Sequence, residues 1–292
     1  MKFAVSSYSL YPLVKKGEKT EKQLIGVAKE LGFDGIEFAE IHPLDGTDKI
    51  LYAEELKKEC ERVGVEPVQY SVGADFIYGS NGDLSKETER LKKEVDVAVA
   101  LGVKGMRHDA TGGYNDEDKK YMGFEQALGR ITEGYRTVTE YAEKRGIRTM
   151  IENHGWFCQD SDRIERIVTG VSHKNFGVLI DMGNFLCADE NPVTAVSRLA
   201  PFVSYVHAKD FHIKSGESFP PCDAFFKSRG GNYLRGAVFG HGNVPVFQIL
   251  GILKDSGYNG YITLEFEGHE DIMLANKWSL NTLKTMCKAL NW

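Results

Sequence analysis

The chain has 292 residues, of which 42% are hydrophobic and 27% charged, a composition typical of a soluble globular protein with a sizeable core. Its net charge of −6 gives no electrostatic attraction for nucleic acid or an anionic membrane, and no apolar run approaches the length of a membrane span. The scattered cysteines form no C-x-x-C pair, which argues against a thiolate zinc site and favours a reducing compartment: Cys60, Cys158, Cys187, Cys222 and Cys287. We therefore expect a cytoplasmic protein with no nucleic-acid or membrane partner.

Short β-rich runs alternate along the chain with longer stretches of helical pattern. The expected strands cover residues 2–7, 35–39, 65–71, 105–108, 148–152, 176–181, 202–207 and 260–266. Helices that stop at glycine are expected at 20–32, 84–102 and 121–146, the first beginning at Thr20 as its N-cap. Strict alternation predicts a parallel sheet, and eight such units in 292 residues fit a closed (β/α)8 barrel better than an open sheet. The first strand is followed by no G-x-G-x-x-G, which weakens a dinucleotide-binding alternative.

We predict a single α/β TIM-barrel domain over residues 1–292, because no linker or low-complexity tract divides the chain. One segment, 209–244, breaks the alternation and is too long for an ordinary loop of this fold. Insertions of this kind are usually functional lids or disordered. We expect residues 209–244 to be an active-site loop insert after strand seven.

Alternate side chains of a barrel strand point inward, and the chemistry of the fold lies at the C-terminal ends of its strands. Four consecutive expected strands end in an ionisable residue of inward parity: Glu152, Asp181, His207 and Glu265. Three carboxylates converging in a low-dielectric mouth would repel one another, and a divalent cation would supply the missing charge. One imidazole with carboxylate oxygens suits manganese, magnesium, zinc or cobalt. The alternative is that each residue caps its own strand or forms an ion pair.

Five segments carry a resemblance to a known family: GFDGIEF at 32–38, IENHG at 151–155, LIDMGN at 179–184, VHAKDF at 206–211 and the run 239–268. They resemble the xylose isomerase-like TIM barrels, the group of sugar phosphate isomerases and epimerases that includes ketose 3-epimerases, inosose dehydratases and, more distantly, endonuclease IV. The resemblance implies that Glu152, Asp181, His207 and Glu265 bind one divalent metal ion, and that the two glutamates exchange a substrate proton. Asn184 departs from the epimerases, in which a histidine often contacts the substrate after DMG.

Two candidates for substrate contacts follow the ligand strands directly. His154 would hydrogen-bond a sugar hydroxyl or serve as a base, the alternative being a structural histidine after the strand. Lys209 has inward parity and would stabilise an oxyanion, unless it forms a salt bridge with Glu267 or Asp181.

Four further candidates come from other parts of the chain. His108, at the end of strand four, would contact substrate or be a satisfied barrel histidine. Glu37 has inward parity, and the resemblance implies a place near the substrate, against a structural ion pair. Trp156, with Phe157, would cover an apolar sugar face or serve in packing. Arg235 would meet an anionic group or be a solvated surface residue.

We expect a divalent-metal-dependent isomerase or epimerase that acts on a small sugar or polyol through a metal-bound enediolate. The metal makes the C–H beside a carbonyl acidic, one carboxylate removes the proton and another returns it, with Glu152 and Glu265 in these roles. The same enolisation followed by elimination would make a dehydratase or lyase, for example on an inosose or keto-sugar derivative. The chain could instead be a non-catalytic sugar-binding or partner subunit or, least favoured, an endonuclease IV-like DNA repair enzyme. Sequence leaves open the sugar, the native metal and whether the chain forms a homo-oligomer.

Overall fold

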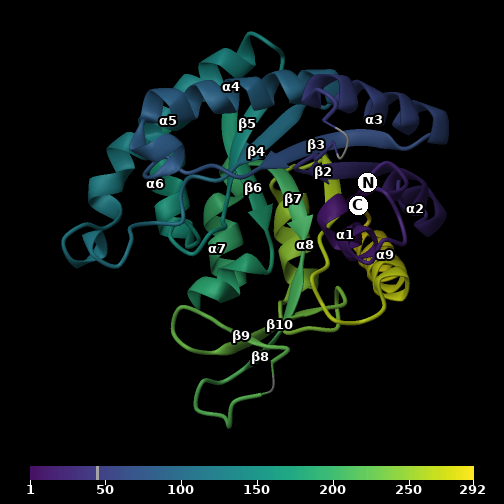
Figure 1. Cartoon of the computed structure of the whole chain (residues 1–292). Coiled ribbons are helices and arrows are strands. Elements are labelled where there is room, and N and C mark those ends of the chain that lie inside the picture. Colours follow the sequence, from purple (N-terminus) through teal and green to yellow (C-terminus); the bar gives the residue numbers. More distant parts are fainter. Residues whose placement is uncertain (44–45, 222) are drawn as a thin grey trace.

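Eight parallel strands form a closed barrel at the centre of the molecule (Figure 1). The computed structural model describes residues 1–43, 46–221 and 223–292, so Cys222 lies outside the described residues. Around the barrel the strand order is β1-β11-β7-β6-β5-β4-β3-β2, which confirms the predicted (β/α)8 fold. The barrel strands are β1 (Lys2–Ser6), β2 (Gly35–Ala39), β3 (Glu66–Val72), β4 (Gly105–His108), β5 (Arg148–Glu152), β6 (Phe176–Asp181), β7 (Val203–Ala208) and β11 (Tyr261–Leu264).

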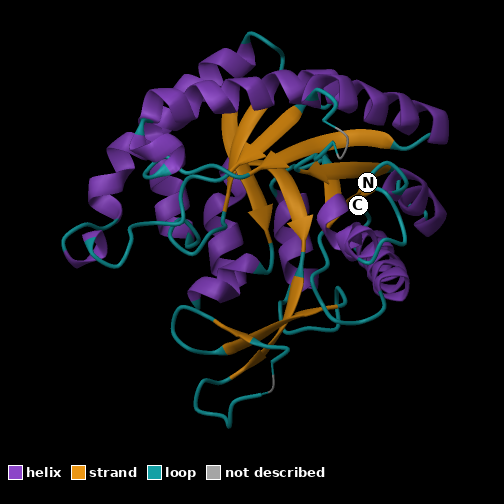
Figure 2. Ribbon diagram, viewed as in Figure 1, coloured by secondary structure: helices purple, strands orange, loops and turns teal. Residues whose placement is uncertain are grey.

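Helices cover the outside of the barrel (Figure 2). They are α1 (Ser7–Lys15), α2 (Leu24–Leu31), α3 (Lys49–Val63), α4 (Leu84–Leu101), α5 (Phe124–Glu143), α6 (Ser161–Val171), α7 (Pro192–Leu199), α8 (Val246–Asp255) and α9 (Ile272–Ala289). Short 3-10 helices lie at Gly79–Gly82, Asp118–Lys120, Asn184–Ala188 and Ala200–Phe202. Over the residues that the structure describes, none of the helices is long and apolar enough to cross a membrane.

The termini of α4 follow the capping residues of the sequence, whereas α2 and α5 are shorter than the predicted helices, α5 covering Phe124–Glu143 instead of 121–146. Helix α4 begins where the side chain of Asp83 accepts a hydrogen bond from the Lys86 N–H, and it ends at Gly102, whose φ of 80° favours glycine. Helix α2 begins at Leu24 rather than just after the predicted cap Thr20. Thr20 and Gln23 instead exchange hydrogen bonds, side chain to backbone, at 2.8 and 3.3 Å, which makes a separate turn before the helix.

Inside the barrel, an apolar cluster lies below the polar side chains of the C-terminal mouth. Met150, Leu179 and Tyr205 form one buried cluster inside the barrel, against which Val68 and Tyr261 pack. Successive inward positions lie two residues apart on a strand. Two positions further along β5, β6 and β7, the next inward residues are ionisable, and they lie at the C-terminal mouth of the barrel.

The long insert after β7 forms a small sheet of its own, drawn at the bottom of the view in Figure 1. Its strands β8 (Asp210–Lys214), β10 (Tyr233–Ala237) and β9 (Phe226–Lys227) pair antiparallel in the order β8-β10-β9. Asp210 anchors it, because its carboxylate accepts hydrogen bonds from the N–H groups of Gly240, Gly242 and Val244 at 2.8–3.1 Å. The described part of the segment predicted as a loop thus contains an antiparallel sheet at the C-terminal side of β7.

Candidate metal centre and active site

Strand register brings the four predicted ligands to one place. Asp181 on β6 pairs in register with His207 on β7, and His207 pairs with Thr263 on β11. Glu265 follows β11 with the same parity as Thr263, and its N–H donates to the carbonyl of Ala208 at 3.2 Å. The C-terminal ends of neighbouring parallel strands therefore deliver these side chains to the barrel mouth.

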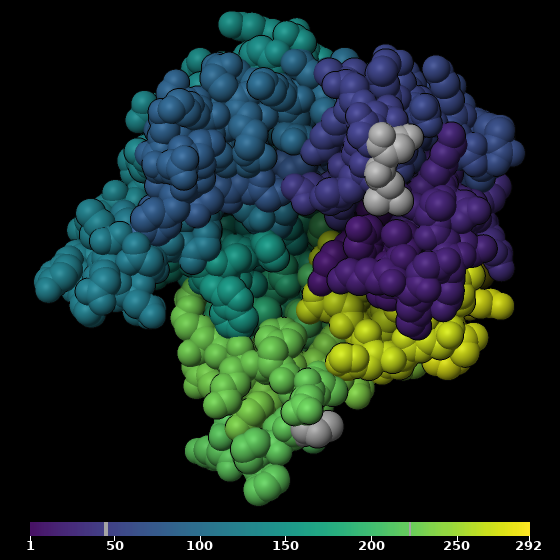
Figure 3. Space-filling view, in the orientation of Figure 1, coloured from purple at the N-terminus to yellow at the C-terminus, as the bar shows by residue number. Residues whose placement is uncertain are grey.

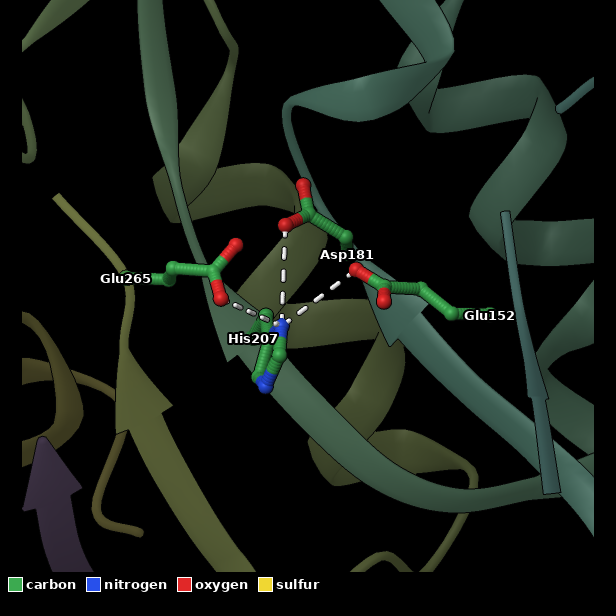
Figure 4. A group of neighbouring side chains, drawn as sticks. All are labelled: Glu152, Asp181, His207 and Glu265. Atoms are coloured by element: carbon green, nitrogen blue, oxygen red, sulfur yellow. Dashed lines mark ion pairs between the residues drawn. The ribbon is translucent and has the colours of Figure 1, made fainter. Parts of the chain in front are cut away.

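The four side chains stand at the spacing of ligands that share one cation. Each offers one ligand atom, and these atoms all lie within 4.8 Å of one another. Nδ1 of His207 lies in the middle, 3.4 Å from Oε1 of Glu152, 3.8 Å from Oδ2 of Asp181 and 3.6 Å from Oε1 of Glu265 (Figure 4). Atoms bound to one ion at about 2.0–2.6 Å lie at most about 4–5 Å apart.

The ring of His207 is oriented as a metal-binding histidine would be. Its Nε2 donates a hydrogen bond to Oε2 of Glu37 at 2.8 Å. Its Nδ1 faces the three carboxylates and has no hydrogen-bond partner within the described part of the chain. A buried nitrogen without a partner is costly, and histidine ligands typically donate their other nitrogen to a carboxylate. The residues present therefore fit a divalent cation.

The charges of the group also fit a missing cation. Burial, together with the negative charges of Glu152 and Glu265, raises the pKa of Asp181 to about 6 against the opposing effect of Lys209. Burial lowers the pKa of His207, but Glu37 and Glu265 outweigh that effect and hold it well above its usual value. Without a metal, Asp181 and His207 thus hold their protons more tightly than usual, at the place where a divalent cation would otherwise supply positive charge.

The second carboxylate oxygen of each glutamate contacts a buried, positively charged side chain. Oε2 of Glu152 lies 2.6 Å from Nη2 of Arg107, and Oε2 of Glu265 lies 2.6 Å from Nζ of Lys209. Burial opposes the ionisation of both glutamates, but these cations, together with His207, outweigh it and lower both pKa values. Both carboxylates are therefore ionised at neutral pH and available to accept a proton.

Two asparagines hold the strand ends together. Asn153 accepts a hydrogen bond from the N–H of Asp181 at 2.9 Å and donates one to its carbonyl at 3.0 Å, which joins β5 to β6. Asn184 donates to Oε1 of Glu152 at 3.3 Å and accepts from Nζ of Lys209 at 3.3 Å. Asn184 thus bridges the two sides of the site, at the position where the resemblance to the epimerases suggests a histidine.

A cavity of about 250 Å³ opens above this group at the mouth of the barrel. Figure 3 shows this face hollowed where the purple, teal, green and yellow segments meet. Glu152, His207 and Glu265 line the cavity, together with Arg107 and Tyr8. A concave site in which a few polar groups converge is the usual place for a small-molecule ligand.

Two predicted substrate-binding residues, His154 and Lys209, line this cavity. Nδ1 of His154 lies 2.8 Å from Oδ1 of Asp109. Partial burial opposes protonation of His154, but the hydrogen bond with Asp109 outweighs it and raises the pKa of the imidazole. Nζ of Lys209 lies 3.3 Å from Asp181 and 3.3 Å from Glu267, so Lys209 also forms the salt bridges expected if it does not contact an oxyanion.

Glu37 and His108 are placed differently from the expected substrate contacts. Both are fully buried and outside the described lining of the cavity. Glu37 lies inside the barrel, where it contacts His207 and accepts a hydrogen bond from Oγ of Ser71 at 2.7 Å. His108 points outward and stacks on Tyr135 at 4.5 Å, and burial lowers its pKa to about 4. In the structure Glu37 thus forms an ion pair with His207, and His108 packs against Tyr135, and neither side chain reaches the cavity.

Trp156 and Arg235 are both outside the described lining of the main cavity. Trp156 lines an adjoining cavity of about 380 Å³. Arg235 on β10 lies 3.3 Å from Oε1 of Glu270 and is outside the described linings of both cavities. Its expected contact with an anionic group is replaced by this ion pair.

Arg107 and Asp109 are two site residues that sequence reasoning missed. Nη2 of Arg107 contacts Oδ1 of Asp109 at 2.9 Å as well as Glu152, and Arg107 pairs in register with Met150 on the inward face. The parity rule that selected the ligands would also have selected Arg107 on β4 in place of His108, whose side chain points to the helices.

Comparison with known proteins agrees with this architecture. A family model described as xylose isomerase-like TIM barrel matches residues 25–287. An inosose dehydratase of Klebsiella pneumoniae subsp. pneumoniae is 24% identical over 276 residues, which cover 89% of this chain and 86% of that protein.

Two solved structures share the fold at low sequence identity. A xylose isomerase-like TIM barrel protein from Mycobacterium smegmatis, in complex with magnesium, matches with a TM-score of 0.70 and 21% identity, covering 92% of this chain and 88% of that one. L-ribulose 3-epimerase matches with a TM-score of 0.71 and 14% identity, covering 100% of this chain and 96% of that one.

Proposed function

The chain belongs to the xylose isomerase-like TIM barrel family, and on this basis we propose that it is a divalent-metal-dependent enzyme that removes the proton beside the carbonyl of a small keto-sugar or keto-polyol. One observation carries the proposal. Glu152 and Glu265 approach His207 from different strands, and each holds its second oxygen against a cation at 2.6 Å. Two ionised carboxylates therefore lie beside the position that a metal ion bound by His207 would occupy.

The residues have separable roles in this proposal. Glu152, Asp181, His207 and Glu265 would hold the ion, which when bound supplies a Lewis acid that polarises the substrate carbonyl. Glu37 fixes the His207 ring through the 2.8 Å contact with Nε2. Arg107 and Lys209 line the cavity and place positive charge where negative charge develops as the proton leaves.

The first outcome that this site supports is epimerisation or isomerisation. One glutamate removes the proton from carbon and, now protonated, can return it to the neighbouring carbon, whereas the other glutamate can protonate the opposite face once it has taken up a proton from solvent. Both glutamates line the cavity, and their Oε1 atoms lie 3.4 and 3.6 Å from the same nitrogen of His207. A substrate bound in this cavity would therefore meet both carboxylates.

The second outcome is elimination of water, and the pair of His154 and Asp109 favours it. His154 lines the cavity, and Asp109 raises the pKa of its imidazole. A protonated imidazole can donate its proton to a leaving hydroxyl directly, whereas a glutamate can do so only after it has taken up a proton. The similarity to an inosose dehydratase supports this outcome as well.

The test is solvent deuterium exchange over a panel of ketoses, inososes and keto-glycosides, with metal analysis of the purified protein. We expect deuterium to enter the carbon beside the carbonyl only when a divalent ion is present. Product of unchanged mass, apart from deuterium, identifies epimerisation or isomerisation, whereas loss of water identifies dehydration. Ligand binding without exchange at any metal would refute the enzyme and leave a sugar-binding protein.

A further inference from the structure

The cavity beside the metal group is larger than the cavity above it. The adjoining cavity measures about 380 Å³, against about 250 Å³ over the predicted ligands. His154, Lys209 and Glu267 belong to the linings of both. A single sugar ring held over the four ligands would therefore leave the larger space beside it empty.

Trp156 and Phe226 form one side of this second cavity, which we call the aromatic wall. Their side chains are 44% and 36% exposed, and their rings meet edge to face with centroids 6.3 Å apart. Phe226 also packs on the buried ring of Phe211 at 5.7 Å. Exposed aromatic faces beside a few polar groups are typical of ligand cavities, because the faces cover apolar C–H surface.

The backbone of Trp156 has a conformation that residues other than glycine rarely adopt. Its φ is 64°, in the left-handed region. The N–H donates to Oε1 of Gln159 at 2.7 Å, and the carbonyl accepts from the guanidinium of Arg229, which also contacts Asp160 at 3.0 Å. Such conformations concentrate at ligand and active sites. The β5–α6 loop and the insert thus hold the indole exposed on the cavity wall.

We propose that the second cavity is a subsite for a second sugar ring, so that the substrate is a keto-glycoside. The keto ring lies over the four predicted ligands, and the linked ring lies against the aromatic wall. Glu267 and Lys209, 3.3 Å apart, stand at the boundary of the two cavities, where their charged groups meet hydroxyls of both rings. This inference rests on the proposed function and specifies its substrate class.

The test compares 3-ketoglucose with the 3-keto forms of cellobiose, maltose and trehalose. We expect wild-type protein to prefer at least one ketodisaccharide in kcat/KM by about tenfold, the size of an aromatic anchor contact. Trp156→Ala and Phe226→Ala each remove most of this preference, and Trp156→Phe keeps part of it. Phe247→Ala is the matched control, because Phe247 is 47% exposed but lies on α8, outside both described linings.

Two results would overturn the subsite. One is wild-type protein that turns over the monosaccharide as efficiently as every ketodisaccharide. The other is a Trp156→Ala variant in which both kinds of substrate lose the same factor.

Failure of the proposed function gives a different result, namely no deuterium exchange with any ketone at any divalent metal. The subsite is then judged by binding of the unoxidised disaccharides and of glucose, followed by tryptophan fluorescence. Tighter binding of a disaccharide than of glucose, weakened by Phe226→Ala and not by Phe247→Ala, supports the subsite. Equal binding of disaccharides and glucose overturns it.

Discussion

Glu37 accepts a hydrogen bond from Nε2 of His207 at 2.8 Å, although the two residues are 170 positions apart and lie on strands that do not pair. Both side chains are buried inside the barrel. The contact fixes the proton on Nε2 and turns Nδ1 toward the three carboxylates. Glu37 therefore orients the predicted metal ligand from beneath, without lining the cavity.

Replacing Glu37 by Gln is expected to weaken divalent-metal binding by about ten- to a hundredfold. The amide keeps the volume of the side chain but removes the negative charge that makes the imidazole a better ligand. Calorimetric titration with Mn²⁺ or Mg²⁺ measures the effect. Glu66→Gln is a matched control, because Glu66 is half exposed at the N-terminal end of β3. Equal affinities of Glu37→Gln and wild type would contradict the role of Glu37.

Glu152→Gln and Glu265→Gln are each expected to lower turnover by about 10²- to 10⁴-fold, because an amide cannot accept the substrate proton. The measurement is the rate of solvent deuterium exchange at saturating metal, with circular dichroism to show that the fold is kept. Glu117→Gln, at a side chain 83% exposed, is the control and should retain the wild-type rate. Unchanged rates in both site variants would refute the proton-transfer roles.

Asp181→Asn is expected to stabilise the metal-free protein at pH 7 while removing metal binding. The pKa of Asp181 is raised to about 6 in the folded protein by burial and by Glu152 and Glu265, so the folded state binds this proton more tightly than the unfolded state. Ionisation of Asp181 therefore costs stability at pH 7, on the order of 3 kcal/mol, and the cost disappears as pH falls through 6 toward 4.

Urea unfolding of metal-free wild type and Asp181→Asn across pH 4–8 measures this difference. We expect the gap in unfolding free energy between the two proteins to be largest above about pH 7 and to close toward pH 4. A variant less stable than wild type at every pH would show that the contacts of Asp181 with Lys209 outweigh the repulsion.

Asp109→Asn is expected to reduce elimination relative to proton exchange. The neutral amide no longer holds the pKa of His154 up, so less of the imidazole carries the proton that a leaving hydroxyl requires. The ratio of dehydrated product to deuterium-exchanged substrate, measured on an inosose, should fall by about 10-fold or more.

His154→Gln should lower the same ratio, since it removes the donor itself. Asp116→Asn, at a side chain 91% exposed, serves as the control. If the ratio stays constant in both site variants, His154 is not the proton donor for elimination.

Local patterns in the amino-acid sequence were sufficient to predict the barrel and the meeting of four side chains. Strand–helix alternation predicted eight parallel strands, whose observed ends lie within two residues of those expected. Because side chains alternate with a period of two and parallel strands present the same end, parity at the C-terminus of each strand selected Glu152, Asp181, His207 and Glu265. Both rules are local, so they can be applied without knowing the tertiary fold.

The tertiary structure alone sets how far along the barrel axis each inward side chain lies and which side chain it contacts across the barrel. Glu37 has inward parity but contacts His207 instead of the cavity, since the stagger between non-adjacent strands sets its height. The two wall aromatics, Trp156 and Phe226, come from segments 70 residues apart and meet because the insert forms a sheet that returns to the mouth. Such contacts depend on barrel closure and on long-range packing, neither of which leaves a periodic signal in the sequence.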